Sequence, residues 1–214
     1  MTADFRDLLQ SYADEPLTHQ VMKHLLKEYR RPNDKIHELV RSGILVPLRR
    51  GLYVAGPNVK TEKPSLFLLA NHMRGPSYIS LETALSHWGL IPERVYETVS
   101  VTLESSKLYQ TPAGRFRYLH ATLPYYAFGI ASILITPRQR VLIATPEKAL
   151  CDKIVLTSGI FLRSVRSTKE FLIDDLRLEE EGLRRLRLPE LRAWEKEAPK
   201  SQSIGMLIKT LEQL

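Results

Sequence analysis

The sequence has a single cysteine, Cys151, among its 214 residues, so no disulfide bond can form within the chain. It also has no apolar run of the roughly 20 residues that a membrane-spanning helix requires. Its first residues, MTADFRDLLQ, show no basic stretch followed by an apolar one, which is the pattern of a secretory signal. These absences predict a protein of the reducing cytoplasm with no membrane partner.

Motifs of catalysis and cofactor binding are also missing. There is no glycine-rich phosphate loop, and no serine lies in a nucleophile-elbow motif. The six histidines are scattered, and none stands with Cys151 or a carboxylate at a familiar metal-ligand spacing. Cys151 itself falls on an apolar helix face, which is typical of a small buried residue rather than a nucleophile. We therefore expect no enzyme activity, no metal site and no cofactor.

One pair of residues keeps an enzymatic alternative open. Glu147 and Lys148 follow a β-prone run, and nuclease-like folds place an acid and a lysine near a strand end to hold Mg²⁺ and water. However, Thr145 and Pro146 mark a helix start, where the helix dipole stabilises an acid in the first turn. A structural role is therefore sufficient for Glu147.

What the sequence does have is positive charge. With 31 Lys and Arg against 24 Asp and Glu, the formal net charge is +7 and the pI about 9.5. Such a surplus favours a polyanionic partner. The surplus is densest in Thr18–Val54, where eight basic residues stand against three acidic ones, a net of +5.

Two short helices are predicted within this basic stretch. In Leu17–Tyr29 the apolar residues recur at spacings of three and four, which gives a helix one buried stripe. Thr18 is suited to cap its start. Pro32 then opens a second helix, and Gly43 stands where a left-handed cap ends it.

A tight hairpin follows the two helices. Ile44–Leu48 and Leu52–Val54 are β-prone runs around Arg49, Arg50 and Gly51, a basic turn with glycine available for a positive φ. Pro47 has no amide hydrogen and so places its strand at an edge or a bulge.

Two helices and a basic hairpin are the layout of a winged helix-turn-helix, so the sequence predicts binding to double-stranded operator DNA. The second helix would enter the major groove, and the hairpin, or wing, would contact the backbone or minor groove. The predicted DNA-binding residues are Lys23, Lys27, Arg30, Arg31, Asn33, Lys35, His37, Arg41, Arg49 and Arg50. Asp34 and Glu38 oppose this reading because they repel phosphates unless they accept from cytosine amines. The alternative is a winged-helix module that contacts proteins.

We predict two domains, residues 1–60 and residues 64–214, joined by a link rich in turn formers and charge, Gly56–Pro64. A helix from Phe5 to Tyr12 would pack beneath the first unit. The second unit is expected to be α+β: a small antiparallel sheet from about Val95 to Ala144, with helices before and after it. The cluster Tyr125, Tyr126 and Phe128 could stack bases, but in a β-rich segment it is typical of core packing.

Three segments carry a resemblance to a known family. LVRSGILVPLRRGLYV resembles the helix-to-wing segment of AbiEi-family antitoxins, which occur in type IV toxin–antitoxin and phage-defence operons. YISLETALSHWGLIPE and VLIATPEKALCDKI are similar to two further segments of that family, in the same order and at a fitting separation. The resemblance touches most of the first 155 residues.

This resemblance implies a repressor of its own operon that counters a separately encoded, nucleotidyltransferase-like toxin. Direct binding of the toxin is not implied, since such antitoxins can act on the toxin's target or on its activity. The competing hypotheses are a regulatory interaction module with weak DNA affinity and a nuclease-like defence enzyme.

Overall fold

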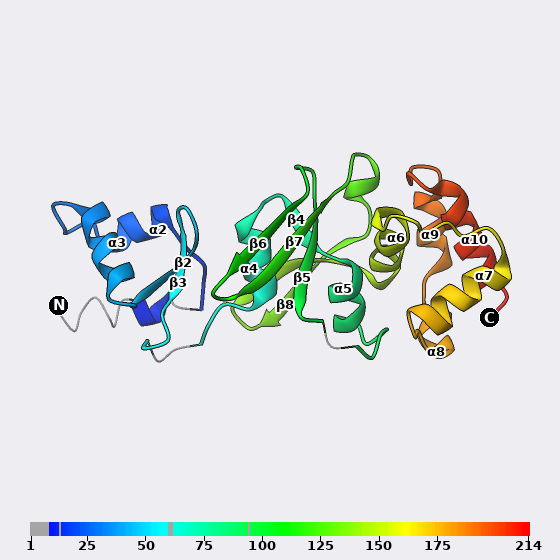
Figure 1. Ribbon diagram of the computed structural model, residues 1–214, viewed down its shortest axis with the longest axis horizontal. Coiled ribbons are helices and arrows are strands. Elements are labelled where there is room, and N and C mark those ends of the chain that lie inside the picture. The colour runs from blue at the N-terminus through cyan, green and yellow to red at the C-terminus, as the bar shows by residue number, and fades with distance from the viewer. Residues whose placement is uncertain (1–8, 13, 60–61, 94) are drawn as a thin grey trace.

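The computed structural model describes residues 9–12, 14–59, 62–93 and 95–214. It shows an elongated α+β protein with two hydrophobic cores (Figure 1). We call its two parts the N-terminal unit (residues 9–59) and the C-terminal unit (residues 62–214). The predicted helix Phe5–Tyr12 lies mostly outside the described residues, as does the middle of the predicted link Gly56–Pro64. No helix in the described ranges is long and apolar enough to cross a membrane.

The N-terminal unit combines two helices with a three-stranded antiparallel sheet of order β1-β3-β2. Its elements are β1 (Leu17–Thr18), α2 (His19–Leu25), α3 (Pro32–Arg41), β2 (Leu45–Arg49) and β3 (Leu52–Ala55). The Thr18 hydroxyl accepts a hydrogen bond from the Val21 amide at 3.2 Å, as the sequence predicted. However, α2 is shorter than the predicted helix Leu17–Tyr29, because Leu17 pairs with Tyr53 as a strand.

The helix α3 has the predicted ends. Pro32 occupies its first turn, where the missing amide hydrogen costs nothing. Gly43 follows it with a φ of +68°, in the left-handed region that glycine enters without strain. Ile36 and Leu39 are buried beneath the helix, which fixes the side that it turns outward.

The hairpin β2–β3 is buried on both of its faces. Leu45 and Ala55 belong to the core of the N-terminal unit. Leu48, Leu52 and Val54 belong instead to the larger core, which is otherwise built from the C-terminal unit. Figure 1 shows the hairpin on the side of the N-terminal unit that faces the C-terminal unit. This position explains why the hairpin sequence is apolar without strict alternation.

A six-stranded sheet forms the centre of the C-terminal unit, in the order β6-β7-β5-β4-β9-β8. The prediction of a small antiparallel sheet was wrong, because β5 pairs with β7 and β4 with β9 in parallel. The sheet also begins before Val95, with the strand β4. The strands are β4 (Ser77–Ile79), β5 (Glu97–Thr102), β6 (Lys107–Thr111), β7 (Gly114–His120), β8 (Ile130–Thr136) and β9 (Gln139–Ala144).

Helices cover both faces of this sheet: α4 (Leu66–Met73), α5 (Leu81–His87) and α6 (Pro146–Leu156). On one face the Tyr118 hydroxyl donates to the carbonyl of Ala70 in α4 at 2.7 Å. On the other face the Tyr78 hydroxyl donates to the carboxylate of Asp152 in α6 at 3.0 Å. The strand β5 lies between these layers and is buried on both sides.

The helix α5 starts without a side-chain cap, although serine before a helix is a common capping residue. Ser80 precedes the helix, but its hydroxyl donates to Asp152 at 2.7 Å and makes no cap. The helix α6 begins as expected, with the Thr145 hydroxyl accepting from the Lys148 amide at 3.3 Å.

Short helices complete the chain and pack at the end distant from the N-terminal unit (Figure 1). Among them α10 packs against α9, α7 and α6. These elements are α7 (Val165–Glu170), the π-helix η2 (Phe171–Asp175), α8 (Glu180–Arg184), α9 (Leu188–Glu195) and α10 (Ser201–Leu211), whereas the 3₁₀ turn η1 (Tyr125–Ala127) lies between β7 and β8. Tyr125 and Tyr126 are buried, as expected of core residues, although they lie in a turn rather than a strand.

Candidate nucleic-acid interface

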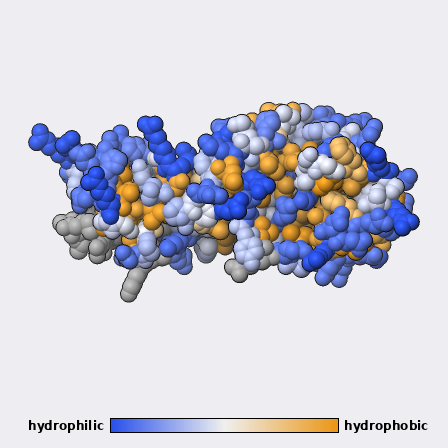
Figure 2. All heavy atoms as spheres, in the orientation of Figure 1, coloured by the Kyte–Doolittle hydropathy of each residue, from blue (hydrophilic) through white to orange (hydrophobic). Residues whose placement is uncertain are grey.

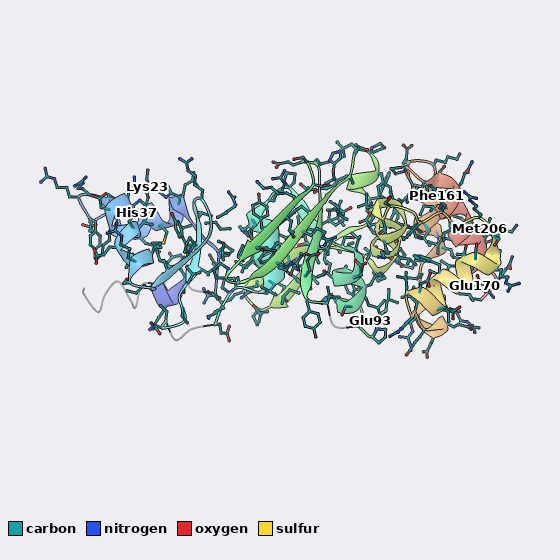
Figure 3. The ribbon with its side chains drawn as sticks, viewed as in Figure 1. Lys23, His37, Glu93, Phe161, Glu170 and Met206 are labelled. Carbon is teal, nitrogen blue, oxygen red and sulfur yellow. The ribbon has the colours of Figure 1, made fainter. Side chains whose placement is uncertain are left out.

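The helix α3 turns a polar side away from the core. His37 and Arg41 are exposed there together with Asp34 and Glu38, and these four residues border a shallow hollow of about 380 Å³. Figure 3 shows His37 on α3 and Lys23 on the neighbouring α2. An exposed helix with polar side chains along one side is the kind of element that fits a DNA major groove.

A second hollow, of about 670 Å³, lies between α3 and the tip of the hairpin. Asn33 and His37 line it from the helix, and Arg50 lines it from the hairpin. The structure therefore brings three of the predicted DNA-binding residues to one place, although thirteen positions or more separate Arg50 from the other two. This hollow is the centre of the candidate interface.

His19 and Tyr53 also line this hollow, and the sequence had not indicated them. Their place depends on the two-residue strand β1, which pairs with β3 beside the hairpin tip. The His19 amide donates to the Gly51 carbonyl at 2.8 Å, which holds the start of α2 against the turn. A strand of two residues leaves no periodic signal in a sequence, so this contact could not be predicted.

Two of the predicted residues have their charge balanced within α3. The Arg31 guanidinium lies 2.8 Å from the Asp34 carboxylate, and the Lys35 ammonium lies 2.6 Å from Glu38. The Lys35 side chain is only 12% exposed, and its ammonium group lies 5.4 Å from the centre of the Tyr29 ring. The structure thus places Lys35 along the side of α3, while His37 is presented outward.

The two arginines at the hairpin tip point in different directions. Arg50 is exposed and lines the hollow beside α3. Arg49 reaches the other way, and its guanidinium donates to the carbonyl of His72 in α4 at 3.4 Å. Arg49 therefore joins the two units, and only Arg50 lies beside Asn33 and His37.

The remaining basic residues of the candidate set are exposed around this centre. These residues are Lys23, Lys27, Arg30 and Arg41. None of them forms an ion pair with a residue in the described ranges. Together with Arg50 they give five unbalanced cations on one small unit. Such cations are suited to phosphate oxygens, which supply sequence-independent affinity.

The pair Glu147 and Lys148 lies in the core, away from any surface. Glu147 is 3% exposed and accepts a hydrogen bond from the Arg187 amide at 2.9 Å. Lys148 is fully buried, and burial lowers its pKa while the neighbouring Asp152 opposes that shift. Cys151 is buried beside them, and burial raises the pKa of its thiol. Burial of these side chains, and their contacts with Arg187 and Asp152, fit a role in stabilising the fold.

The described residues contain no group of three or more His, Cys, Asp or Glu side chains that could hold a metal ion. No protein-family model matches the chain, and no curated protein matches it.

Proposed function

We propose that the protein is a DNA-binding repressor that acts as the antitoxin of a type IV toxin–antitoxin system. In this proposal the N-terminal unit is a winged helix-turn-helix, with α3 in the major groove of operator DNA and Arg50 at the wing tip on the adjacent backbone. It acts in the cytoplasm, without a cofactor and without catalysis.

The observation that carries this proposal is the hollow between α3 and the hairpin tip. Asn33 and His37 offer hydrogen-bonding groups to base edges, and Arg50 offers a guanidinium to a phosphate. One contact set reads bases and the other positions the protein, which is the division of labour in specific DNA recognition. The five unbalanced cations support the same function.

The part of the proposal that concerns the toxin rests on the resemblance of three segments to AbiEi-family antitoxins. The C-terminal unit is the part to which we assign protection from a nucleotidyltransferase-like toxin. An adjacent gene for such a toxin would support this assignment, and its absence would weigh against it.

One observation favours a second function, a regulatory module that binds a protein through α3. Asp34 and Glu38 balance Arg31 and Lys35, so the helix that would read DNA carries less surplus charge than its basic residues suggest. A measurement of DNA affinity distinguishes these two functions directly.

The decisive experiment is a footprint of the purified full chain on the region upstream of its own gene, repeated over a range of salt concentrations. If four of the five cations meet phosphates, the logarithm of the binding constant falls by about 3.6 per tenfold increase in salt. A protected site with such a slope supports operator binding. A salt slope near zero, or no protected site, supports the protein-binding module instead.

A further inference from the structure

The two edges of the six-stranded sheet differ in sequence. β6 forms one edge and β8 the other, with β9 as the neighbour of β8 (Figure 1). β6 carries Lys107 and Gln110, and a charged side chain is a common protection of a sheet edge against further strands. β8 reads IASILIT, with five apolar residues and no charged one. The strand β8 itself therefore lacks this protection.

The apolar strand β8 is poorly covered. None of its seven residues is buried, and in the described ranges β9 is the element against which it mainly packs. Leu134 is 55% exposed, and Leu142, on the same face of β9, is 43% exposed. Figure 2 shows apolar atoms at the surface of the C-terminal unit. A further strand beside β8 would cover apolar surface, which favours its binding.

Hydrogen bonds of β9 show which backbone groups of β8 point outward. The Leu142 amide donates to the Asn71 side chain at 2.8 Å, and the Leu142 carbonyl accepts from it at 3.2 Å, so this backbone is turned away from β8. Ser132 is the antiparallel partner of Leu142 and therefore belongs to a pair without hydrogen bonds. Because successive residues alternate, the N–H and C=O groups of Ile130, Ser132 and Leu134 point out of the sheet edge.

These outward groups are open to an incoming strand. Apart from the ladder with β9, the described residues offer them a single hydrogen bond, from the Arg140 guanidinium to the Ser132 carbonyl at 3.5 Å. An extended segment can therefore join the sheet here through main-chain hydrogen bonds, as in β-strand addition.

Arg140 gives this edge its charge. Its guanidinium also donates to the Ser132 hydroxyl at 3.3 Å, at the middle of the open stretch. Arg140 forms no ion pair with any residue that the structure describes, whereas Arg138 lies 3.1 Å from Asp14. An unbalanced cation at the centre of an otherwise neutral edge favours an incoming strand with a carboxylate.

The same cation argues against a second copy of the chain as the occupant. Antiparallel pairing of β8 with itself about Ser132 would bring two Arg140 side chains together, and like charges opposite each other in a sheet are destabilising. In any other register β8 still has no carboxylate to offer to Arg140. The charge at this edge therefore favours a different chain.

We propose that the edge of β8 binds an extended segment of a partner protein, with an acidic residue between two apolar residues on one face of that segment. The segment pairs through its main chain with Ile130, Ser132 and Leu134. Its carboxylate meets Arg140 opposite Ser132, and its apolar side chains cover Ile130 and Leu134. This edge belongs to the C-terminal unit, so the proposal does not depend on operator binding by the N-terminal unit.

The test uses the full chain labelled with ¹⁵N and the end-blocked peptide Val-Thr-Glu-Thr-Val. Side chains alternate along a strand, so the glutamate and both valines lie on the face of Arg140. We expect millimolar peptide to shift the amide resonances of Ile130–Leu134, and to bind about tenfold more tightly than Val-Thr-Lys-Thr-Val. Equal binding of the two peptides, binding only elsewhere on the chain, or no binding would overturn the proposal.

Methylation of the peptide backbone distinguishes strand addition from a simple charge contact. N-methylation of the central glutamate removes an amide hydrogen that faces β8, whereas N-methylation of either threonine removes one that faces away. The first should weaken binding by about tenfold or more, and the second by about threefold or less. Equal effects of the two modifications would contradict pairing through the main chain.

The variant Arg140→Glu should reverse the preference, so that the lysine peptide binds more tightly than the glutamate peptide. The matched control is Lys107→Glu, which makes the same change of charge at the opposite edge of the sheet and should leave the preference unchanged. Both residues are exposed, so both variants should fold. Equal effects of the two variants would show a general charge effect and contradict the assigned site.

Sedimentation of the free chain tests the occupant. We expect a monomer over the concentrations used for the peptide experiments. A dimer whose dissociation on dilution shifts the amide resonances of Ile130–Leu134 would show that a second copy occupies the edge, and would overturn the proposal.

Discussion

The ammonium group of Lys148 lies 3.2 Å from the centre of the Tyr125 ring and donates to the Tyr125 carbonyl at 2.8 Å, and both side chains are fully buried. Asp152, one helical turn along α6, lies 3.1 Å from the same ammonium group. Its carboxylate also accepts from Tyr78 and Ser80. This network joins α6, β4 and η1 at the centre of the C-terminal unit.

Replacing Lys148 by methionine should lower the free energy of unfolding by about 3–5 kcal/mol. The substitution keeps the length of the side chain but leaves the Asp152 carboxylate buried without a cation, which is costlier than losing the whole pair. Urea denaturation followed by circular dichroism measures the change. In the double variant Lys148→Met/Asp152→Asn, part of the loss should be recovered.

The matched control for this prediction is Lys153→Met, in the same helix. Lys153 is paired with Glu82 near the surface, with 16% of its side chain exposed, so its loss should cost about 1 kcal/mol or less. Similar losses for Lys148→Met and Lys153→Met would show that the buried network has no special role in stability.

Stability should fall as the pH rises above 10. Unfolded tyrosine loses its proton near pH 10, whereas burial raises the pKa of Tyr78 and Tyr125 well above 10.0, so they keep their protons in the folded state. The folded state then binds more protons than the unfolded state. Each such tyrosine should lower the free energy of unfolding by about 1.4 kcal/mol per pH unit.

Lys148 changes the pH dependence of stability in the opposite direction. Burial lowers its pKa below 10.5, so the unfolded state binds the extra proton and stability rises with pH between that lowered pKa and 10.5. Above pH 10.5 this rise ends, and what remains is the decline from the tyrosines and from the Cys151 thiol, whose pKa burial also raises. Urea denaturation between pH 9 and 11.5 tests both trends. Tyr78→Phe should reduce the decline of the unfolding free energy by about 1.4 kcal/mol per pH unit. The control is Tyr96→Phe, at an exposed ring. An unchanged slope in Tyr78→Phe would refute the prediction.

Replacing the two arginines of the hairpin tip should have different effects on DNA affinity. Arg50→Ala should weaken binding to all sequences, because a wing mainly positions the protein, and should lower the salt slope by about 0.9. Arg49→Ala should leave DNA affinity unchanged, since Arg49 contacts the His72 carbonyl in α4. Electrophoretic mobility shifts over a salt series measure both effects. If Arg49→Ala weakens binding as much as Arg50→Ala, the interface lies on another side of the hairpin.

His37 should instead determine sequence preference. His37→Ala should change the preferred base at particular operator positions, each by about 1–3 kcal/mol, while non-specific affinity changes little. Binding to a randomised operator library measures this preference. The control is Lys35→Ala, whose side chain is turned toward Glu38 and Tyr29. A uniform loss across all sequences in His37→Ala would place His37 on the backbone rather than on bases.

Local signals in the sequence predicted local structure correctly. Thr18, Pro32, Gly43 and Thr145 each act at one helix end, and their effect depends only on neighbouring residues. The sheet was predicted wrongly, because the parallel pairing of β5 with β7 is decided by packing against helices distant in sequence. Ser80 shows the same limit: serine before a helix favours a cap, but its hydroxyl donates to Asp152, 72 positions away.

The candidate DNA interface was predictable in part. The sequence indicated the exposed side of α3 and the basic hairpin tip, and the structure brings Asn33, His37 and Arg50 together. It could not show that adjacent arginines point apart, since the direction of Arg49 is set by α4 of the C-terminal unit. A hollow of about 710 Å³ between α5, α6, β5 and β7 left no sequence signal, because its lining comes from five separate segments between residues 81 and 176.

The doubly buried hairpin also has a consequence for synthesis of the chain on the ribosome. Leu48, Leu52 and Val54 emerge early, but the strand β9, which completes the sheet of their second core, ends about 90 residues later at Ala144. At about 5–20 residues per second, the nascent chain displays this apolar face for roughly 5–20 s before its cover exists. During that interval the hairpin is a natural binding surface for chaperones.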